Sequence, residues 1–335
     1  MTLAMLKPSR LGAISLASKN SPGSLNPLMK DTLVIGSRGS KLALTQAEMI
    51  KAELVRLEPV IAVRIEIIKT SGDASTDPLS VIGGKGVFTK ELEEALLDSR
   101  IDIAVHSLKD LPTIIPDGLV IAAICKREDP RDALVLNRKL VGSLATIHAL
   151  PQAAIVGTSS PRRLSQLKHL REDLVIKDLR GNVDTRLRKL DEGQYDALVL
   201  ACAGLRRLGM EDRISAALPA AEMLPAVGQG ALGIETRAGD EDTLAAVGKL
   251  DHKFTRLACT AERAFLRSLG GGCQLPIAAY AVVREKRIRL DGLVADPQGR
   301  RIVRDRISGG LDEAEELGAE LGERLLKQGA GELLT

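Results

Sequence analysis

Cys273 stands alone in the segment SLGGGCQLPIAA, residues 268–279, where three glycines precede it and no other cysteine lies within ten residues. Buried cysteines that pack as small hydrophobes usually lie in apolar strands or helices. A thiol in a glycine-rich loop can instead act as a nucleophile, which requires a positioned base. Of the four histidines, His106 is the one that the sequence places at the end of an apolar strand.

Four polar residues follow that strand in the segment AVHSLKDLP, residues 104–112. Ligands of open α/β sheets bind outside the carboxyl ends of the strands, which is where these side chains should lie. A carboxylate beside an ammonium group can donate a proton, accept one or stabilise charge there. A solvated turn at the end of a strand is the alternative. The four residues are His106, Ser107, Lys109 and Asp110.

Arginines recur at the predicted ends of strands and starts of helices, in IGSRGS, GTSSPRR, LRGN and AGLRR. Helix N-termini and bidentate guanidinium groups both bind carboxylates and phosphates. Scattered solvent-exposed arginines are the alternative, but the repeated position favours a polyanionic ligand. The arginines of these segments are Arg38, Arg162, Arg163, Arg180, Arg206 and Arg207, and Arg186 lies six residues after Arg180.

Two glycine-rich segments have superficial similarity to nucleotide-binding loops. GQGALG, residues 228–233, has the spacing GxGxxG, whose mechanism requires a strand before it and a helix after it. A proline precedes it and a strand-like segment follows, so we expect no nucleotide site. IGGKGVFTK, residues 82–90, lacks P-loop spacing. We interpret it as a mobile loop that carries Lys85 and Phe88 over a cleft, with an ordinary surface turn as the alternative.

Apolar strands alternate with amphipathic helices in two blocks of similar size, starting near residues 31 and 154. Such alternation is typical of α/β domains with mainly parallel sheets. Ser40 and Pro161 should begin helices, as an N-cap and a first-turn residue. The second block includes a predicted strand over 195–204.

The tail from about residue 253 differs, with one helix, three strands and an amphipathic helix from Leu311. This order indicates a smaller α+β domain. We expect domain 1 over 31–127 and 228–250, domain 2 over 128–227, and domain 3 over 251–335.

The composition excludes several classes of protein. The chain has 335 residues, 44% of them hydrophobic and 27% charged, and no apolar run long enough to span a bilayer. Its four cysteines form no CxxC pair and its four histidines never lie at ligand spacing, so we expect no disulfide framework and no metal site. Subtracting the +4 of residues 1–30 from the net charge of +3 leaves −1 for residues 31–335. With five aromatic residues in all, a nucleic-acid partner is not expected.

Residues 1–30 form a basic, serine-containing leader without acidic residues. They lack the apolar core of a secretory signal and have the composition of an organellar transit peptide. A disordered tail or an early start codon is the alternative. In either case we leave the leader out of the predicted fold.

Nine segments resemble, in order, the motifs of the porphobilinogen deaminase (hydroxymethylbilane synthase) family. The resemblance covers the chain from about Asp31 into the C-terminal domain, and residues 1–30 have no counterpart in it. Nine motifs in the same order make the resemblance highly specific. The segments are IGSRGSKLALTQA, GGKGVFTKELE, DIAVHSLKDLP, REDPRDAL, GTSSPRR, RGNVDTRL, AGLRRLG, LPAVGQGALGIE and GGCQLPI.

The resemblance implies that Cys273 carries a dipyrromethane cofactor in thioether linkage, which the enzyme assembles from its own substrate. Members of the family join four porphobilinogen units head to tail, release ammonia each time, and free hydroxymethylbilane by hydrolysis in tetrapyrrole biosynthesis. Each pyrrole bears an acetate and a propionate, so the arginines would supply the counter-charge. The glycines would let the adduct leave the backbone without a Cβ clash.

Carried over position by position, the resemblance implies a role for each matching residue. Asp110 would be the catalytic carboxylate, assisting the loss of ammonia and stabilising the positive charge that develops. Lys85 and Phe88 would belong to a loop that covers the cleft. Ser107, Lys109, Thr158, Ser160, Arg162 and Arg163 would bind the cofactor. Arg38, Ser40, Gln46, Arg180, Arg186 and Arg207 would bind the substrate and the growing chain.

The resemblance also implies a fold of two periplasmic-binding-protein-like α/β domains plus a smaller C-terminal α+β domain. The cysteine loop of that third domain would reach the cleft between the other two. Family members act as monomers on porphobilinogen and need no metal. We therefore expect a cytoplasmic monomer without membrane or nucleic-acid partners, or a protein of the plastid stroma if the leader is a transit peptide.

Three residues depart from the family pattern. Pro161 stands where leucine is common and suits the first turn of a helix. Asp184 puts a negative charge where a small or neutral residue is usual, and Val81 stands where lysine is common. Asp184 and Val81 both make the site less positively charged, which should weaken anion binding. We therefore predict slower elongation or a higher apparent KM for porphobilinogen. A Val81→Lys variant that changed neither would contradict this prediction.

Two other classes remain open from the residues alone, because a fold does not fix a function. The first is a two-lobed anion-binding protein without catalysis, against which the lone thiol and the lack of a secretory signal argue. The second is a hydrolase or transferase with a cysteine nucleophile, for which His106 is the candidate base.

Overall fold

The computed structural model describes residues 30–70, 89–140, 142, 145–272 and 274–334. Lys30, which the sequence analysis placed in the leader, packs against the fold through ion pairs with Asp102 at 2.7 Å and Asp240 at 2.5 Å. Four residues singled out above lie outside the described residues, namely Val81, Lys85, Phe88 and Cys273.

The first sheet has five strands in the order β2-β1-β3-β10-β4. β10 pairs antiparallel with both neighbours, and the other pairings are parallel, so four strands run in one direction. The side chain of Ser40 accepts a hydrogen bond from the backbone N–H of Ala43 at 3.3 Å, which confirms the predicted N-cap of α1. The elements are β1 (Thr32–Ser37), α1 (Lys41–Leu57), β2 (Ala62–Ile67), α4 (Lys90–Leu97), β3 (Ile103–Ser107), β4 (Leu119–Ile124), β10 (Leu232–Arg237) and α8 (Glu241–Gly248).

The second sheet has the order β7-β6-β8-β5-β9 and the same plan, with β5 as its antiparallel strand. Pro161 is the first residue of α5, as predicted. The elements are β5 (Asp132–Leu136), β6 (Ile155–Gly157), α5 (Pro161–Leu170), β7 (Val175–Lys177), α6 (Val183–Asp191), β8 (Ala197–Ala201), α7 (Cys202–Arg207) and β9 (Ala216–Ala217).

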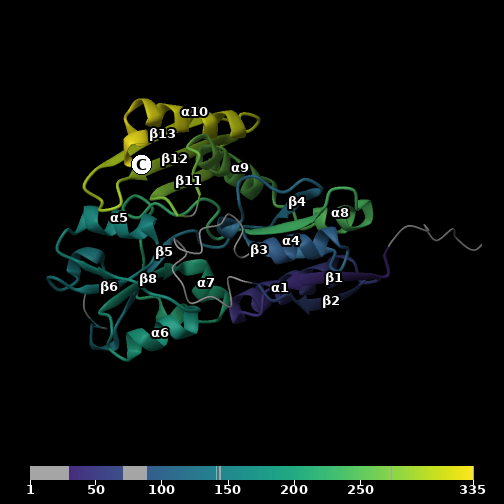
Figure 1. The fold of residues 1–335 in the computed structure, drawn as a ribbon, viewed down its shortest axis with the longest axis horizontal. Helices are drawn as coiled ribbons and strands as arrows, with labels where there is room; N and C mark the ends of the chain where they lie inside the picture. Colours follow the sequence, from purple (N-terminus) through teal and green to yellow (C-terminus); the bar gives the residue numbers. More distant parts are fainter. Residues whose placement is uncertain (1–29, 71–88, 141, 143–144, 273, 335) are drawn as a thin grey trace, which may run out of the picture.

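The chain crosses twice between these sheets, from β4 to β5 over residues 125–131 and from β9 to β10 over residues 218–231. Each crossing leads directly into the antiparallel strand of the sheet that it enters. Two such sheets joined by two crossings form the periplasmic-binding-protein-like pair of α/β domains that was predicted. Figure 1 shows the two sheets side by side, with the third domain above them.

The third domain is an antiparallel sheet, β11-β12-β13, covered by two packed helices. Its core centres on the fully buried Phe265. A Cβ at Gly292 of β12 would lie 2.7 Å from the Phe265 ring, so the close packing there needs glycine. The predicted α+β domain is therefore confirmed. Its elements are α9 (Lys253–Ser268), β11 (Ile277–Arg284), β12 (Arg287–Ala295), β13 (Ile302–Gly310) and α10 (Ala314–Lys327).

One predicted strand is too long. The sequence analysis extended it over 195–204, but β8 ends at Ala201 and α7 begins at Cys202. Cys202 and Leu205 are both fully buried and lie three residues apart, which is the spacing of a helix face and not of a strand face. Among the described residues, no helix is long and apolar enough to cross a membrane.

Candidate active site

The carboxyl end of β3 presents the predicted polar cluster. β3 ends at Ser107, and a single 3-10 turn, Leu108–Asp110, follows it. Gln46 of α1 is buried and donates from Nε2 to Ser107 Oγ at 3.0 Å. The Asp110 carboxylate is exposed and, within the described part of the chain, has no hydrogen-bond or ion-pair partner of its own. It is thus accessible to a ligand.

The ammonium group of Lys109 lies in a desolvated, electropositive position. Its Nζ is 3.5 Å from Gln229 Oε1. Burial lowers the pKa of Lys109 to about 8, and repulsion by Arg163 adds to this, whereas Asp110 and Asp132 oppose it. A bound anion would remove part of this penalty, so the position favours an anionic ligand.

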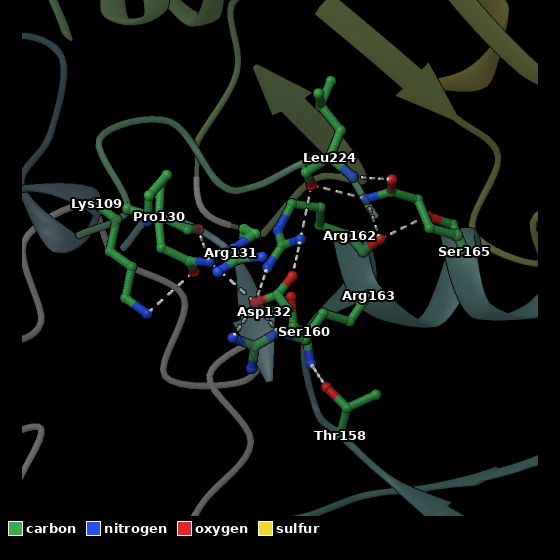
Figure 2. Close-up of polar contacts among 12 residues, drawn as sticks. Lys109, Pro130, Arg131, Asp132, Thr158, Ser160, Arg162, Arg163, Ser165 and Leu224 are labelled. Atoms are coloured by element: carbon green, nitrogen blue, oxygen red, sulfur yellow. Dashed lines mark hydrogen bonds and ion pairs between the residues drawn. The ribbon is translucent and has the colours of Figure 1, made fainter. Parts of the chain in front are cut away.

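Arg162 and Arg163 both extend from the first turn of α5 to Asp132 (Figure 2). Arg162 Nη1 donates to Oδ2 at 2.7 Å, and Arg163 Nη2 donates to Oδ1 at 2.8 Å. All three side chains are at least nine-tenths buried. Although burial raises the pKa of Asp132, the two guanidinium groups lower it well below its usual range. Asp132 therefore carries a negative charge and fixes the direction of both arginines.

The sequence analysis gave no role to Asp132. Its position in the sequence could have indicated a role. Asp132 is the first residue of β5, the strand DALVL, whose other residues are apolar and buried. A charged side chain is rarely buried unless it is paired. The sequence therefore implied a cationic partner for Asp132, but not which one.

The N-terminus of α5 adds backbone and hydroxyl donors to the cationic groups. Thr158 is buried, and its Oγ1 accepts from the backbone N–H of Ser160 at 3.2 Å. Ser160 precedes the helix, but its side chain makes no capping hydrogen bond. The hydroxyl of Ser160 is thus not used to cap the helix, at a position that favours negative charge.

Arg186 belongs to the same group of charges. It lies in α6 and donates from Nε to the carbonyl of Gly181 at 2.7 Å. Burial lowers the pKa of Arg186 to about 10, Arg163 lowers it further, and Asp110 raises it. Arg186 of the second domain therefore interacts electrostatically with Asp110 of the first.

Arg180 follows the end of β7, whereas Arg207 is the last residue of α7 and not at a strand end as predicted. Arg207 donates from Nη2 to the carbonyl of Gly230 at 2.6 Å, while its Nε is buried and has no hydrogen-bond partner among the described residues. Burial lowers the pKa of Arg207, and Glu128 opposes this. Arg180 is half-buried, with Nη2 4.0 Å from Asp178. A buried nitrogen without an acceptor fits a position where an anion binds.

Among the residues expected to bind substrate in the first domain, Arg38 is half-buried between β1 and α1. Ser40 already caps α1, so its hydroxyl has a structural partner. Gln46 contacts Ser107, which joins a predicted substrate residue to a predicted cofactor residue. The structure therefore brings the β3 end, α1 and the α5 arginines toward one region between the domains.

The GxGxxG segment forms a turn in the second crossing, and the strand β10 follows it, not a helix. Gly228 has φ +70° and Gly230 has φ +90°, which other residues adopt only under strain. A Cβ at Gly228 would lie 3.0 Å from Leu108, and one at Gly230 would overlap the carbonyl oxygen of Glu128. Gly228 thus lets the second crossing pass close to the β3 end, and Gly230 lets it pass close to the first crossing at Glu128.

Asp184, which departs from the family pattern, lies in the first turn of α6. Its Oδ1 is 3.6 Å from Nζ of Lys41, the first residue of α1 in the other domain. Both side chains are about half-exposed. The extra negative charge is therefore partly offset by Lys41.

His106, the candidate base of a cysteine hydrolase, is buried within the first sheet. Its Nε2 lies 3.1 Å from Oε2 of Glu235 on β10, and Glu235 is fully buried. The ring is thus held by a carboxylate inside the domain and is not directed at a ligand.

The site fits a ligand with several carboxylates. Its cations outnumber its anions, and the pKa values of Lys109, Arg162 and Arg186 are all lowered, mainly by burial. An anion that binds among closely spaced, desolvated cations lowers their free energy, because it offsets their repulsion and their loss of solvation. The cations are Lys109, Arg162, Arg163 and Arg186, and the anions are Asp110 and Asp132.

The structure is that of a protein with two α/β domains, a third α+β domain and a cluster of buried cations between the first two, which suits an anionic ligand. Two family models match the chain: "Porphobilinogen deaminase, dipyromethane cofactor binding domain" over residues 33–245 and "Porphobilinogen deaminase, C-terminal domain" over residues 256–327. The chain belongs to the porphobilinogen deaminase family.

Relatives in sequence agree with this assignment over nearly the whole chain. The porphobilinogen deaminase of Prochlorococcus marinus strain MIT 9313 is 51% identical over 304 residues, covering 90% of this chain and 95% of its own. That of Pelotomaculum thermopropionicum is 50% identical over 307 residues, covering 91% and 97%. Among solved structures, a periplasmic domain of Bordetella pertussis BvgS matches with a TM-score of 0.39 and 14% identity over 66% of this chain and 86% of its own.

The chain is therefore an enzyme, a transferase of tetrapyrrole biosynthesis that acts on porphobilinogen, and its cofactor is dipyrromethane. The carboxylates of that cofactor match the excess of buried cations described above. The resemblance found in the sequence is confirmed, and the two alternative classes, a receptor without catalysis and a cysteine hydrolase, are not supported.

Proposed function

We propose that Cys273 carries the dipyrromethane and that the cations at the β3 end and at α5 hold its carboxylates. The observation that carries this proposal is the convergence of Lys109, Arg162 and Arg163 beside an exposed Asp110. Cys273 lies five residues before Ala278, which packs against Leu224 of the second domain. Because Leu224 also accepts a hydrogen bond from Arg162, the start of β11 lies near the arginines. Cys273 itself lies outside the described residues.

The remaining cofactor contacts follow from the same geometry. Ser107, Thr158 and Ser160 carry hydroxyl groups beside the cationic side chains, and hydroxyls can donate to carboxylates. Asp132 occupies two donors of each guanidinium, and Arg162 Nη1 also donates to the carbonyl of Leu224 at 2.8 Å. The remaining N–H groups would bind the carboxylates of the ligand. When bound, the dipyrromethane would supply the terminal pyrrole to which the first porphobilinogen unit is joined, and each later unit is joined to the ring added before it.

Asp110 acts on the arriving substrate. The aminomethyl group of porphobilinogen reacts as an ammonium group. When its carbon–nitrogen bond breaks, the electron pair leaves with the nitrogen as neutral ammonia, and the positive charge passes to the pyrrole. The Asp110 carboxylate stabilises that charge because it is held on a short turn at the end of β3. Lys109 and Arg186 both interact electrostatically with Asp110, so all three groups face the same region.

The other predicted residues serve the substrate and the growing chain. Arg186 and Arg207 have desolvated guanidinium groups, which favour binding of carboxylates. Lys85 and Phe88, assigned to a covering loop, lie outside the described residues. Asp184 lowers the affinity of the protein for the growing pyrrole chain only weakly, because Lys41 lies beside it and offsets its charge. The substrate-binding residues are Arg38, Ser40, Gln46, Arg180, Arg186 and Arg207.

We also propose domain boundaries and a cellular setting. Domain 1 spans 31–127 and 228–250, domain 2 spans 128–227, and domain 3 spans 251–335. The protein acts as a monomer in the cytoplasm, without a membrane or nucleic-acid partner, or in the plastid stroma if residues 1–30 are a transit peptide.

The proposed site is tested by turnover of porphobilinogen with the Cys273→Ser chain and a matched Cys125→Ser control. Consumption of porphobilinogen, release of ammonia and the mass of the protein are measured together. We expect Cys273→Ser to carry no pyrroles and to lose turnover, while Cys125→Ser keeps both. A Cys273→Ser chain that still retains two pyrroles would place the attachment elsewhere.

A further inference from the structure

Gln229 lies at the meeting point of the first two domains, between the glycines of the second crossing. Its side chain is 1% exposed. The backbone carbonyl of Gln229 accepts from Arg127 Nε at 2.8 Å, and Arg127 in turn pairs with the buried Glu262 of the third domain. The residue is therefore anchored where all three domains meet.

The side-chain amide of Gln229 joins charged groups of both α/β domains. Its Oε1 lies 3.5 Å from Lys109 Nζ, at the β3 end of the first domain. Its Nε2 donates to Asp132 Oδ1 at 2.9 Å and to the carbonyl of Pro130 at 2.7 Å, both at the entry to the second domain. One amide thus uses its acceptor on one domain and its two donors on the other.

These contacts fit a neutral amide better than other side chains of that size. A carboxylate would place a negative charge beside Asp132 and lose both donors. A methionine would fill the space but supply neither donor nor a strong acceptor. Gly228 and Gly230, with positive φ, hold the backbone so that the amide reaches both partners.

We propose that Gln229 is a positioning residue that holds Lys109 of the first domain in a fixed geometry relative to Asp132 of the second. Asp132 in turn directs Arg162 and Arg163, so both sets of cations face the same carboxylates. The inference rests on the cofactor-binding role proposed above. It adds that the two halves of that site are coupled through one buried amide.

The test uses the full chain made in a host that cannot supply porphobilinogen, so that no cofactor is present at the start. NMR titration of ¹³Cε-labelled lysine, with Lys109→Arg to assign the signal, follows the ionisation of Lys109. Intact mass after addition of porphobilinogen follows the gain of two pyrroles at a series of pH values. In the Gln229→Glu chain we expect the Lys109 titration to move upward by about one pH unit or more, because an opposite charge lies within a few ångströms.

The Gln229→Met chain removes the link without adding charge. We expect it to load the cofactor about tenfold more slowly or worse, the order expected when a hydrogen bond to a charged group is lost. Gln166→Met is the matched control, because Gln166 is an equally buried glutamine that bonds only to backbone groups of Arg162 and Leu224. It should lower stability but load as the unaltered chain does.

Three results would overturn the inference. Native loading by Gln229→Met would show that the link is not needed, and an unchanged Lys109 titration in Gln229→Glu would show that the amide does not contact Lys109. Native loading by a Lys109→Met chain would overturn the proposed role of Lys109 and the inference with it. In that third case the titration in Gln229→Glu would still move, so the failure would lie in the proposed function.

Discussion

Replacing Asp132 with asparagine should destabilise the cofactor-free protein strongly. Asp132 is fully buried and accepts four hydrogen bonds from Arg162 and Arg163, between 2.7 and 3.2 Å. Asparagine removes the charge and turns an NH₂ group toward one guanidinium donor. Two buried guanidinium groups then lack their counter-charge, which costs about 3–5 kcal/mol for a broken buried pair.

Urea unfolding of the cofactor-free chain measures this change as a difference in the free energy of unfolding. The matched control is Asp191→Asn, which breaks the more exposed ion pair with Arg213 at 2.7 Å. We expect the control to cost less than about 1 kcal/mol. If Asp132→Asn also lowered the free energy of unfolding by less than about 1 kcal/mol, Asp132 would not be the charge that stabilises the two buried arginines.

The same variant has a defined pH dependence. The pKa of Asp132 is lowered in the folded protein, so its contribution to stability is present above the pKa of an unfolded aspartate, about 4, and is lost as the pH falls below it. The difference between the two chains should therefore shrink under acid conditions. A difference that stayed constant down to about pH 2 would mean that the charge of Asp132 is not its source.

Three further predictions concern the reaction. The pKa of Lys109 is lowered to about 8, so the cofactor-free protein should take up its two pyrroles more slowly as the pH rises through that value. A time course of intact mass measures the uptake, and the Lys109→Arg variant should not show the decline. Asp110→Asn should lower kcat by a factor on the order of 100 or more with the cofactor still attached, and a kcat within about threefold of the unaltered enzyme would contradict its assignment. Asp184→Ala should lower the apparent KM for porphobilinogen by less than about threefold at low salt, because Lys41 already offsets the charge; a larger change would show that the pair is not formed.

Local features of the fold were predictable from the sequence. The Ser40 cap and Pro161 at the start of α5 depend on residues within one turn, so their patterns can be read without knowing the fold. The polar cluster after β3 was also predictable, because a strand end in an open α/β sheet is a ligand position. The strand over 195–204 was wrong at its end because apolar residues suit both β8 and the buried face of α7.

The supporting contacts of the site were not predictable in the same way. Asp132 meets Arg162 only because a crossing places β5 beside α5, and Gln229 meets Lys109 only because the second crossing returns past the β3 end. The partner of Asp184 likewise lies in the other domain. Such pairs depend on topology, and one sequence carries no pattern that specifies them.

The most direct test of the account is the intact mass of the purified, denatured protein, followed by mapping of the peptide that contains Cys273. The account predicts a mass excess equal to two linked pyrrole units, located on that peptide. An unmodified Cys273 in protein from a host that supplies porphobilinogen would contradict it.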